Sequence, residues 1–211
     1  MLQRGGRISS LHGSVVKFRA MALRAAVILL CCLSMMARAA EPWGTDLNGH
    51  SVEQIAPPGT KAVVLFFAAS DCPIANRYIP EMERLDREFA PQGVRFWWVY
   101  PNPGDTAAAV RQHDVQFNIH ADSVLDTDQR LTRMAHATMT PEVAVLIPFL
   151  AGLREVYRGR IDDRYVTLGQ ERPAATRHDL ELAIHAVLAR EPVPQPDGPP
   201  VGCSIVPRNA P

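Results

Sequence analysis

The placement of its cysteines gives the first indication of chemistry in this sequence. Cys72 directly follows the apolar run 62–68 and precedes Pro73, a residue that favours the first turn of a helix. Unpaired amides and the positive end of the helix dipole stabilise a thiolate at such a position. The spacing therefore predicts a cysteine that ionises readily and acts as a nucleophile. The alternative is a buried, inert cysteine that packs as a small hydrophobic residue.

A second cysteine, Cys203, lies in a proline-rich tail, residues 191–211. Seven of the chain's 18 prolines fall in this tail, so we expect it to be extended and weakly ordered. An extended linker spans ~3.1 Å per residue, which is enough for Cys203 to reach Cys72. We hypothesise that Cys203 resolves an oxidised or mixed-disulfide form of Cys72. The alternatives are an unpaired thiol and a disulfide to another molecule.

Hydrophobic patterning predicts the elements that position Cys72. The run 62–68 is typical of a buried parallel strand, and the apolar residues of 73–89 recur at helical spacing. The other predicted elements are a strand at 94–100, helices at 105–117 and 126–135, a hairpin of strands at 143–148 and 154–160, and a last helix with a Thr176–Asp179 capping box. This order indicates the α/β class, with a mixed sheet flanked by helices in one domain, residues 41–190.

The N-terminal segment, residues 1–39, has the three parts of a secretory signal peptide. It holds six basic and no acidic residues, an apolar run at 25–33, and an Ala-x-Ala pattern that ends at Ala39. We expect cleavage after Ala39, a periplasmic or secreted protein, and no stable membrane span afterwards. An uncleaved membrane anchor is the alternative, and Met21 is an alternative start.

Loss of this segment changes both the charge and the cysteine content. The whole chain has 22 basic and 22 acidic residues, so it is not a generally basic protein that coats nucleic acid. Subtracting the six basic residues leaves 16 basic against 22 acidic, a net charge of −6. Cys31 and Cys32 are removed, and Cys72 and Cys203 remain in an oxidising compartment where a disulfide can persist.

Three segments of the chain match a known superfamily: strand 63–67, the stretch 71–81, and residues 139–142. They resemble the thioredoxin-like superfamily, and within it the redoxin group of AhpC/TSA and TlpA-like proteins, over Trp43 to Arg190. Pro80 matches the proline that kinks the active-site helix of that superfamily. The terminal Gly202-Cys203 is similar to the tail of a secreted redoxin subgroup. The resemblance implies a thioredoxin-like fold with a reactive cysteine.

The resemblance also implies neighbours for the nucleophile. Thr140-Pro141 matches the pair whose proline is cis in this superfamily and lies beside the cysteine, where it would hold an extended thiol partner. The predicted hairpin returns Arg160 to the same end of the sheet. Its guanidinium could stabilise a thiolate or hold an anionic or peroxidic substrate. The alternative is an ordinary ion pair with Asp162 or Asp163.

This chain lacks several residues that related families use for their reactions. A resolving cysteine of the Cys-x-x-Cys type would stand at Ala75, so the short-range dithiol is absent. Peroxiredoxins carry a threonine and a proline where this chain has Ala69 and Leu65. Copper assembly factors of the Cys-x-x-x-Cys type would need a cysteine at Asn76.

Three functions stay open at this point. The first is an extracytoplasmic thiol-disulfide oxidoreductase that uses Cys72, with Cys203 as the hypothesised resolving cysteine, on protein or small-molecule thiols and disulfides. The second is a peroxide reductase with antioxidant activity, assisted by Arg160. The third is a non-enzymatic module that binds copper or a partner through soft cysteine ligands.

We expect neither a cofactor nor a metal site. Five histidines lack zinc-type spacing with paired cysteines: His113, His120, His136, His178 and His185. The sequence also lacks a glycine-rich phosphate loop and a basic-aromatic patch for nucleic acid.

Overall fold

The structure is a computed structural model, and it describes residues 41–150 and 152–208. The predicted signal peptide, with Cys31 and Cys32, lies outside these residues. Within the described ranges, no helix combines the length and the hydrophobicity that a membrane crossing requires. The compact unit that carries the sheet begins at Pro42.

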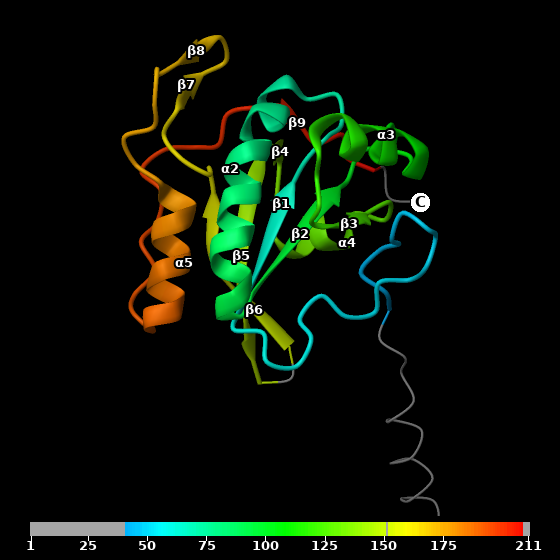
Figure 1. Ribbon diagram of the computed structural model, residues 1–211, viewed down its shortest axis with the longest axis horizontal. Helices are drawn as coiled ribbons and strands as arrows, with labels where there is room; N and C mark the ends of the chain where they lie inside the picture. Colours follow the sequence, from blue (N-terminus) through cyan, green and yellow to red (C-terminus); the bar gives the residue numbers. More distant parts are fainter. Residues whose placement is uncertain (1–40, 151, 209–211) are drawn as a thin grey trace, which may run out of the picture. The chain divides into compact units, whose positions relative to one another are not determined.

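The centre of this unit is a five-stranded mixed sheet. Its strands are β1 (Ala62–Phe67), β2 (Val94–Tyr100), β3 (Asp122–Leu125), β5 (Glu142–Phe149) and β6 (Gly152–Gly159). Their order is β3-β2-β1-β5-β6 (Figure 1). The first three run parallel, whereas β5 pairs antiparallel with both β1 and β6. The predicted α/β class and the predicted hairpin are confirmed.

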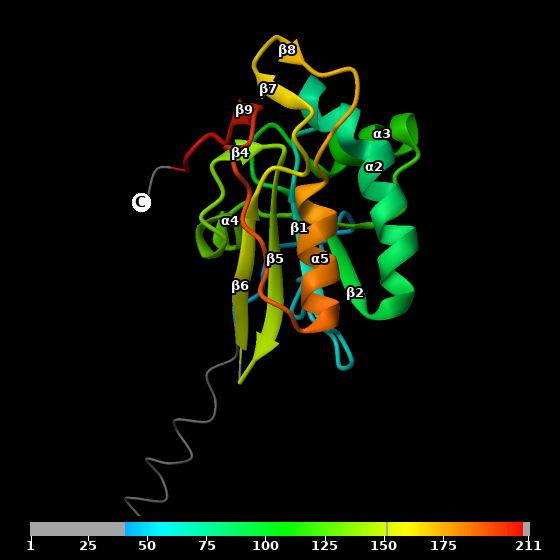
Figure 2. The ribbon, with the colours of Figure 1, turned by 90° about the vertical axis from the view of Figure 1, so that its left-hand side faces the viewer.

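Helices cover both faces of this sheet. They are α2 (Pro73–Phe89), α3 (Ala107–Phe117), α4 (Arg130–Met134) and α5 (Asp179–Ala189), with a short 3-10 helix at Ala90–Gln92. α2 and α5 lie side by side on one face, and α4 lies on the other (Figures 1 and 2). Cys72, at the start of α2, is therefore placed by the helix that packs on the sheet centre.

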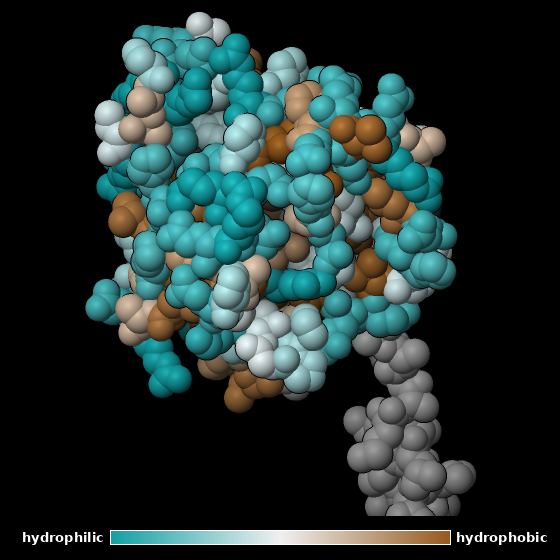
Figure 3. Space-filling view, viewed as in Figure 1, coloured by the Kyte–Doolittle hydropathy of each residue, from teal (hydrophilic) through white to brown (hydrophobic). Residues whose placement is uncertain are grey.

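Strand β1 explains why the apolar run before Cys72 is continuous. All six of its residues are buried. Val64 and Phe66 pack in the cluster that contains the inner faces of α2 and α5, whereas Val63 and Leu65 pack in the cluster that contains α4. A strand with helices on both faces has no solvent side, so it needs no polar residues. The outer face in Figure 3 is mostly hydrophilic by contrast.

Two helix predictions need correction. The predicted capping box is wrong, because the Thr176 amide and hydroxyl both donate to Asp163, at 2.7 and 2.6 Å, and α5 begins later with His178 as its N-cap. The helix predicted over 126–135 is shorter. The Asp126 carboxylate accepts hydrogen bonds from the amides of α4, and only 130–134 is helical.

Several short strands were not predicted. They are β3, β4 (Met139–Thr140), β7 (Tyr165–Thr167), β8 (Gln170–Glu171) and β9 (Cys203–Ser204). β4 pairs with β9, and β7 pairs with β8, both antiparallel. Four of these strands have two or three residues, too few to show an alternating pattern.

The tail is extended, as expected, but it is not loosely attached. It runs from α5 along β5 and β6 to β4 (Figure 2). The Gln195 side chain donates to the Val156 carbonyl at 3.1 Å, and Pro196 packs beside Gly159. The prediction of weak order is therefore wrong, because the composition of the tail does not reveal these contacts with the body.

Candidate functional site

Cys72 lies at the end of β1 as the N-cap of α2, with Pro73 in the first helical turn. Its side chain is only 1% exposed. The Sγ atom lies 3.0 Å from the Thr140 carbonyl oxygen and 3.1 Å from Sγ of Cys203. Among the described residues, no helix amide donates to this sulfur. The expected amide contacts are thus missing, and the direct partners are a carbonyl and a second sulfur.

The position of Cys72 still favours an anion in one respect. The first turn of α2 carries no acidic side chain to offset the positive end of the helix dipole, although Asp71 directly precedes Cys72. Pro80 lies inside α2, as the resemblance implies. Cys203 covers Cys72, so the Cys72 thiol does not open onto the neighbouring pocket.

The Thr140-Pro141 peptide bond is cis, as expected. Glu142, which is buried, accepts hydrogen bonds from the amides of Thr138 (2.7 Å) and Met139 (3.1 Å). These bonds fix the loop that turns the Thr140 carbonyl toward Cys72. The pair predicted to lie beside the nucleophile therefore does so.

The tail reaches this loop through the β4–β9 pair, in which Cys203 stands opposite Thr140. Gly202 makes the approach possible. A Cβ atom at this position would lie 2.1 Å from the Thr140 carbonyl oxygen, far inside van der Waals contact. Only a glycine lets the tail backbone come close enough to place Cys203 over Cys72.

Contacts after Cys203 hold the tail in place. The Ile205 amide donates to the Thr138 carbonyl at 2.9 Å, and its side chain is buried. The Val206 amide donates to Asn102 Oδ1 at 2.9 Å, and Gln129 donates to the Val206 carbonyl at 2.7 Å. Asn102 therefore lies at the rim of the site.

Arg160 lies near Pro141 but contacts neither sulfur. It forms ion pairs with Asp179, at 2.6 Å, and with Asp197 of the tail. It lines a small cavity with Pro141 and Val201. The alternative pairing with Asp162 or Asp163 is wrong, and Arg160 instead fastens the tail to α5. Its catalytic role stays a prediction.

The carboxylates expected beside Arg160 serve other groups. Asp162 accepts a 2.5 Å hydrogen bond from the buried Tyr78 hydroxyl, and Asp163 caps the loop at Thr176. These contacts fix the segment between β6 and α5.

The environment of Cys203 keeps its thiol protonated. Burial, and then the contact with Cys72, raise the pKa of Cys203 to about 11. At neutral pH the pair therefore holds at least one proton, on the Cys203 side. A thiol beside a sulfur at 3.1 Å needs about 1 Å of further approach to form a disulfide bond.

A buried hydrogen-bond network supports the first turn of α2 from behind. The Asn76 side chain donates to the Ser70 carbonyl at 3.3 Å and accepts from His113 Nε2 at 2.8 Å. The Tyr100 hydroxyl lies 3.2 Å from His113 Nδ1. Burial lowers the pKa of His113, so the ring is neutral at neutral pH. Tyr100 is buried in this network.

A pocket of about 560 Å³ opens beside Cys203. Three loops form it: residues 69–71 after β1, residues 102–105 after β2, and residues 203–206 of the tail. Asp105 accepts hydrogen bonds from the amide and the hydroxyl of Ser70, at 2.9 and 2.6 Å. Sequence reasoning missed Ser70 and Asp105. Their positions in the sequence could have revealed them, because each follows one of two predicted strands. Loops after adjacent parallel strands meet at the same edge of a sheet.

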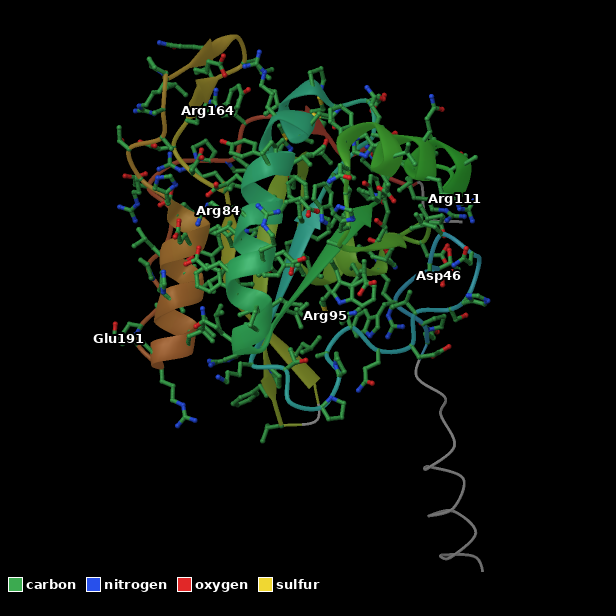
Figure 4. All side chains as sticks on the ribbon, in the orientation of Figure 1. Asp46, Arg84, Arg95, Arg111, Arg164 and Glu191 are labelled. Atoms are coloured by element: carbon green, nitrogen blue, oxygen red, sulfur yellow. The ribbon has the colours of Figure 1, made fainter. Side chains whose placement is uncertain are left out.

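Two clusters on α2 and α5 bring ligand atoms close enough to hold a metal ion. They are Glu81, His178 and Glu181, and Glu88, Glu181 and His185. Arg84 lies between these helices (Figure 4) and pairs with all three carboxylates at 2.7 Å. Its guanidinium offsets part of their negative charge, and the clusters form an ion-pair network that joins the helices.

Comparisons with known proteins agree with this architecture. The model of the AhpC/TSA family matches residues 37–147, which are 111 of the 211 residues. None of the curated proteins matches the chain. An uncharacterized conserved protein from Geobacillus kaustophilus is 25% identical, with a TM-score of 0.67 over 82% of this chain and 91% of that one.

Two further solved structures are similar. A hypothetical protein from Sinorhizobium meliloti 1021 is 23% identical, with a TM-score of 0.65 over 80% of this chain and 91% of that one. A secreted disulfide oxidoreductase from Mycobacterium tuberculosis is 16% identical, with a TM-score of 0.44 over 70% of this chain and 93% of that one. The mixed sheet, the cis proline and the family match confirm the predicted thioredoxin-like fold.

Proposed function

This chain belongs to the AhpC/TSA family, and from that premise we propose that it is a thiol-disulfide oxidoreductase with Cys72 as nucleophile and Cys203 as resolving cysteine. One observation carries the proposal. The only two cysteines of the described residues, 131 positions apart in sequence, have their Sγ atoms 3.1 Å apart. The β4–β9 pairing and Gly202 both serve this approach.

The reaction has two steps. The Cys72 thiolate attacks one sulfur of a substrate disulfide, so a mixed disulfide forms and the other half of the substrate leaves as a thiolate. Cys203 then loses its proton and attacks Sγ of Cys72. The Cys72–Cys203 disulfide forms, the second half of the substrate leaves as a thiolate, and two electrons have passed from the protein to the substrate. In the reverse direction the protein oxidises a dithiol.

Access to Cys72 requires that the tail move. With Cys203 in place the nucleophile is 1% exposed, so a substrate disulfide reaches it only when β9 leaves β4. The substrate strand then takes the vacated place beside Thr140-Pro141, the pair that the superfamily resemblance assigns to an extended thiol partner.

The proposed location is the periplasm or the extracellular space. Its support is the signal-peptide pattern of residues 1–39 and the value of an oxidising compartment for a two-cysteine redox site.

The test compares the wild-type chain with the C72S and C203S variants. Each reduced protein is treated with a small-molecule disulfide, quenched with an alkylating reagent, and mapped by peptide mass spectrometry. We expect a Cys72–Cys203 disulfide in the wild type, a persistent mixed disulfide on Cys72 in C203S, and no mixed disulfide at a comparable rate on Cys203 in C72S. An intramolecular disulfide at Cys72 that forms without Cys203 contradicts the proposal.

Hydrogen peroxide replaces the disulfide in a parallel experiment. Peroxide reduction would use the same sulfurs, with Cys72 oxidised to a sulfenic acid that Cys203 converts to the disulfide with release of water. Ala69, which is buried, has no hydroxyl where peroxiredoxins place their threonine. We therefore expect the substrate disulfide to react faster than peroxide at equal concentration, and the opposite order reassigns the substrate.

A further inference from the structure

The pocket beside Cys203, formed by residues 69–71, 102–105 and 203–206, has no part in the two steps above. We propose that it is the entry site of the reductant, that it selects a positively charged thiol, and that this thiol attacks Cys203 rather than Cys72. The inference rests on the proposed function, because it concerns the disulfide that this function produces.

Exposure distinguishes the two sulfurs. Cys203 is exposed and lines the pocket, whereas Cys72 is 1% exposed and does not. A thiolate must approach a disulfide sulfur along the S–S axis, from the side opposite the leaving sulfur. A thiolate that enters through the pocket therefore attacks Cys203, and Cys72 is the leaving group.

The leaving group favours the same direction. An attack on Cys72 would expel Cys203, whose pKa is raised to about 11 by burial and by the Cys72 contact. A thiol of such low acidity leaves slowly. Attack on Cys203 defers the departure of Cys203 to the second exchange, and the first exchange releases Cys72 at the N-terminus of α2.

Charge gives the pocket its selectivity. Among the described residues that line it, the charged ones are Asp71 and Asp105, and both are acidic. Asp71 is exposed at the opening. Asp105 is only 6% exposed, and its Oδ2 atom finds no hydrogen-bond partner in the described part of the chain. An ammonium group on the incoming thiol would supply the missing donor, whereas a carboxylate would be repelled.

Two thiols reduce the Cys72–Cys203 disulfide in two exchanges. One thiolate forms a bond to Sγ of Cys203, and the Cys72–Cys203 bond breaks with its electron pair on Cys72. A second thiolate then attacks the reductant sulfur of the mixed disulfide, so the oxidised reductant leaves and Cys203 takes a proton. Two electrons pass to the protein from two thiols.

The test uses the oxidised full-length chain and two small thiols, cysteamine with an ammonium group and 3-mercaptopropionate with a carboxylate. The rate at which each reduces the disulfide is measured in wild type, D71N and D105N. Comparing variants for the same thiol cancels the intrinsic reactivity of that thiol. We expect the cysteamine-to-mercaptopropionate rate ratio to fall roughly 3- to 10-fold in each variant, and added salt to reduce it in the wild type.

An exposed carboxylate outside the pocket provides the matched control. E53Q removes one negative charge from the same protein, and we expect its rate ratio to equal that of the wild type. D71N changes an exposed side chain, so the test stands even where D105N disturbs the fold. Mapping the trapped mixed disulfide adds a second readout, because we expect the thiol on Cys203.

The outcomes separate this inference from the proposed function. A rate ratio unchanged in D71N, or a mixed disulfide trapped on Cys72, overturns the entry-site proposal while the Cys72–Cys203 disulfide still forms. Absence of that disulfide in the oxidised wild type overturns the proposed function itself.

Discussion

A single glycine controls whether Cys203 can reach Cys72. Replacing Gly202 with alanine puts a Cβ atom 2.1 Å from the Thr140 carbonyl oxygen, and the nearest atoms are that carbonyl group and the Pro141 ring, neither of which is a flexible side chain. Relieving such an overlap costs about 1 to 3 kcal/mol. We expect G202A to slow the resolving step roughly 10- to 100-fold, measured as the rate at which the mixed disulfide on Cys72 converts to the Cys72–Cys203 disulfide.

The chain offers a matched glycine for comparison. A Cβ atom at Gly152 meets no other atom within 4 Å, so G152A adds the same methyl group without the overlap. Its resolving rate should stay within about twofold of the wild type. Equal rates in G202A and wild type would show that the tail reaches Cys72 by another path.

The reactive residues themselves could be predicted from the sequence, but their surroundings could not. Cys72, Cys203 and Thr140-Pro141 meet in the structure as hypothesised. The expected amide donors to Cys72 are missing, and its sulfur instead contacts a carbonyl oxygen and a second sulfur. Asp105 was missed because its role depends on a loop neighbour 35 residues away.

Among the elements, the two-residue strand β9 determines the redox site. It pairs with β4 over Met139 and Thr140 only, which is too little to hold a tail by itself. Ile205 adds a buried side chain and the bond to the Thr138 carbonyl. These few contacts place Cys203 beside Cys72, and the proposed mechanism requires that a substrate strand can displace them.

Because the buried Ile205 side chain helps to hold the tail, we expect that shortening it releases the tail more often. Truncating a buried isoleucine to alanine costs about 2 kcal/mol or more, which lowers the ratio of docked to undocked tail roughly 30-fold. We expect I205A to expose Cys72 and speed its alkylation by iodoacetamide. V206A is the neighbouring control, because Val206 is 55% exposed and its bonds come from the backbone. Similar alkylation rates in both variants contradict this role of Ile205.

Long elements were predictable, and short ones were not. β1, α2 and the β5–β6 hairpin have enough residues to show their periodicity, and β2 was predicted with its observed bounds. The tail reads as disordered because prolines and polar residues cannot form a core. Its order comes from long-range contacts such as Arg160 with Asp197, which leave no local pattern.

Across the whole molecule, the Cys72–Cys203 disulfide would join residues 131 positions apart, from the end of the first strand to the tail. Closing so long a loop restricts the unfolded chain, and the chain-entropy model gives about 4 to 5 kcal/mol of stabilisation. For a domain of this length that corresponds to roughly 8 to 20 °C in melting temperature. Thermal unfolding of the oxidised and reduced protein, followed by circular dichroism, measures the difference. The C203S variant should melt at one temperature under both conditions, so an equal shift in C203S, or none in the wild type, would place the stabilisation elsewhere.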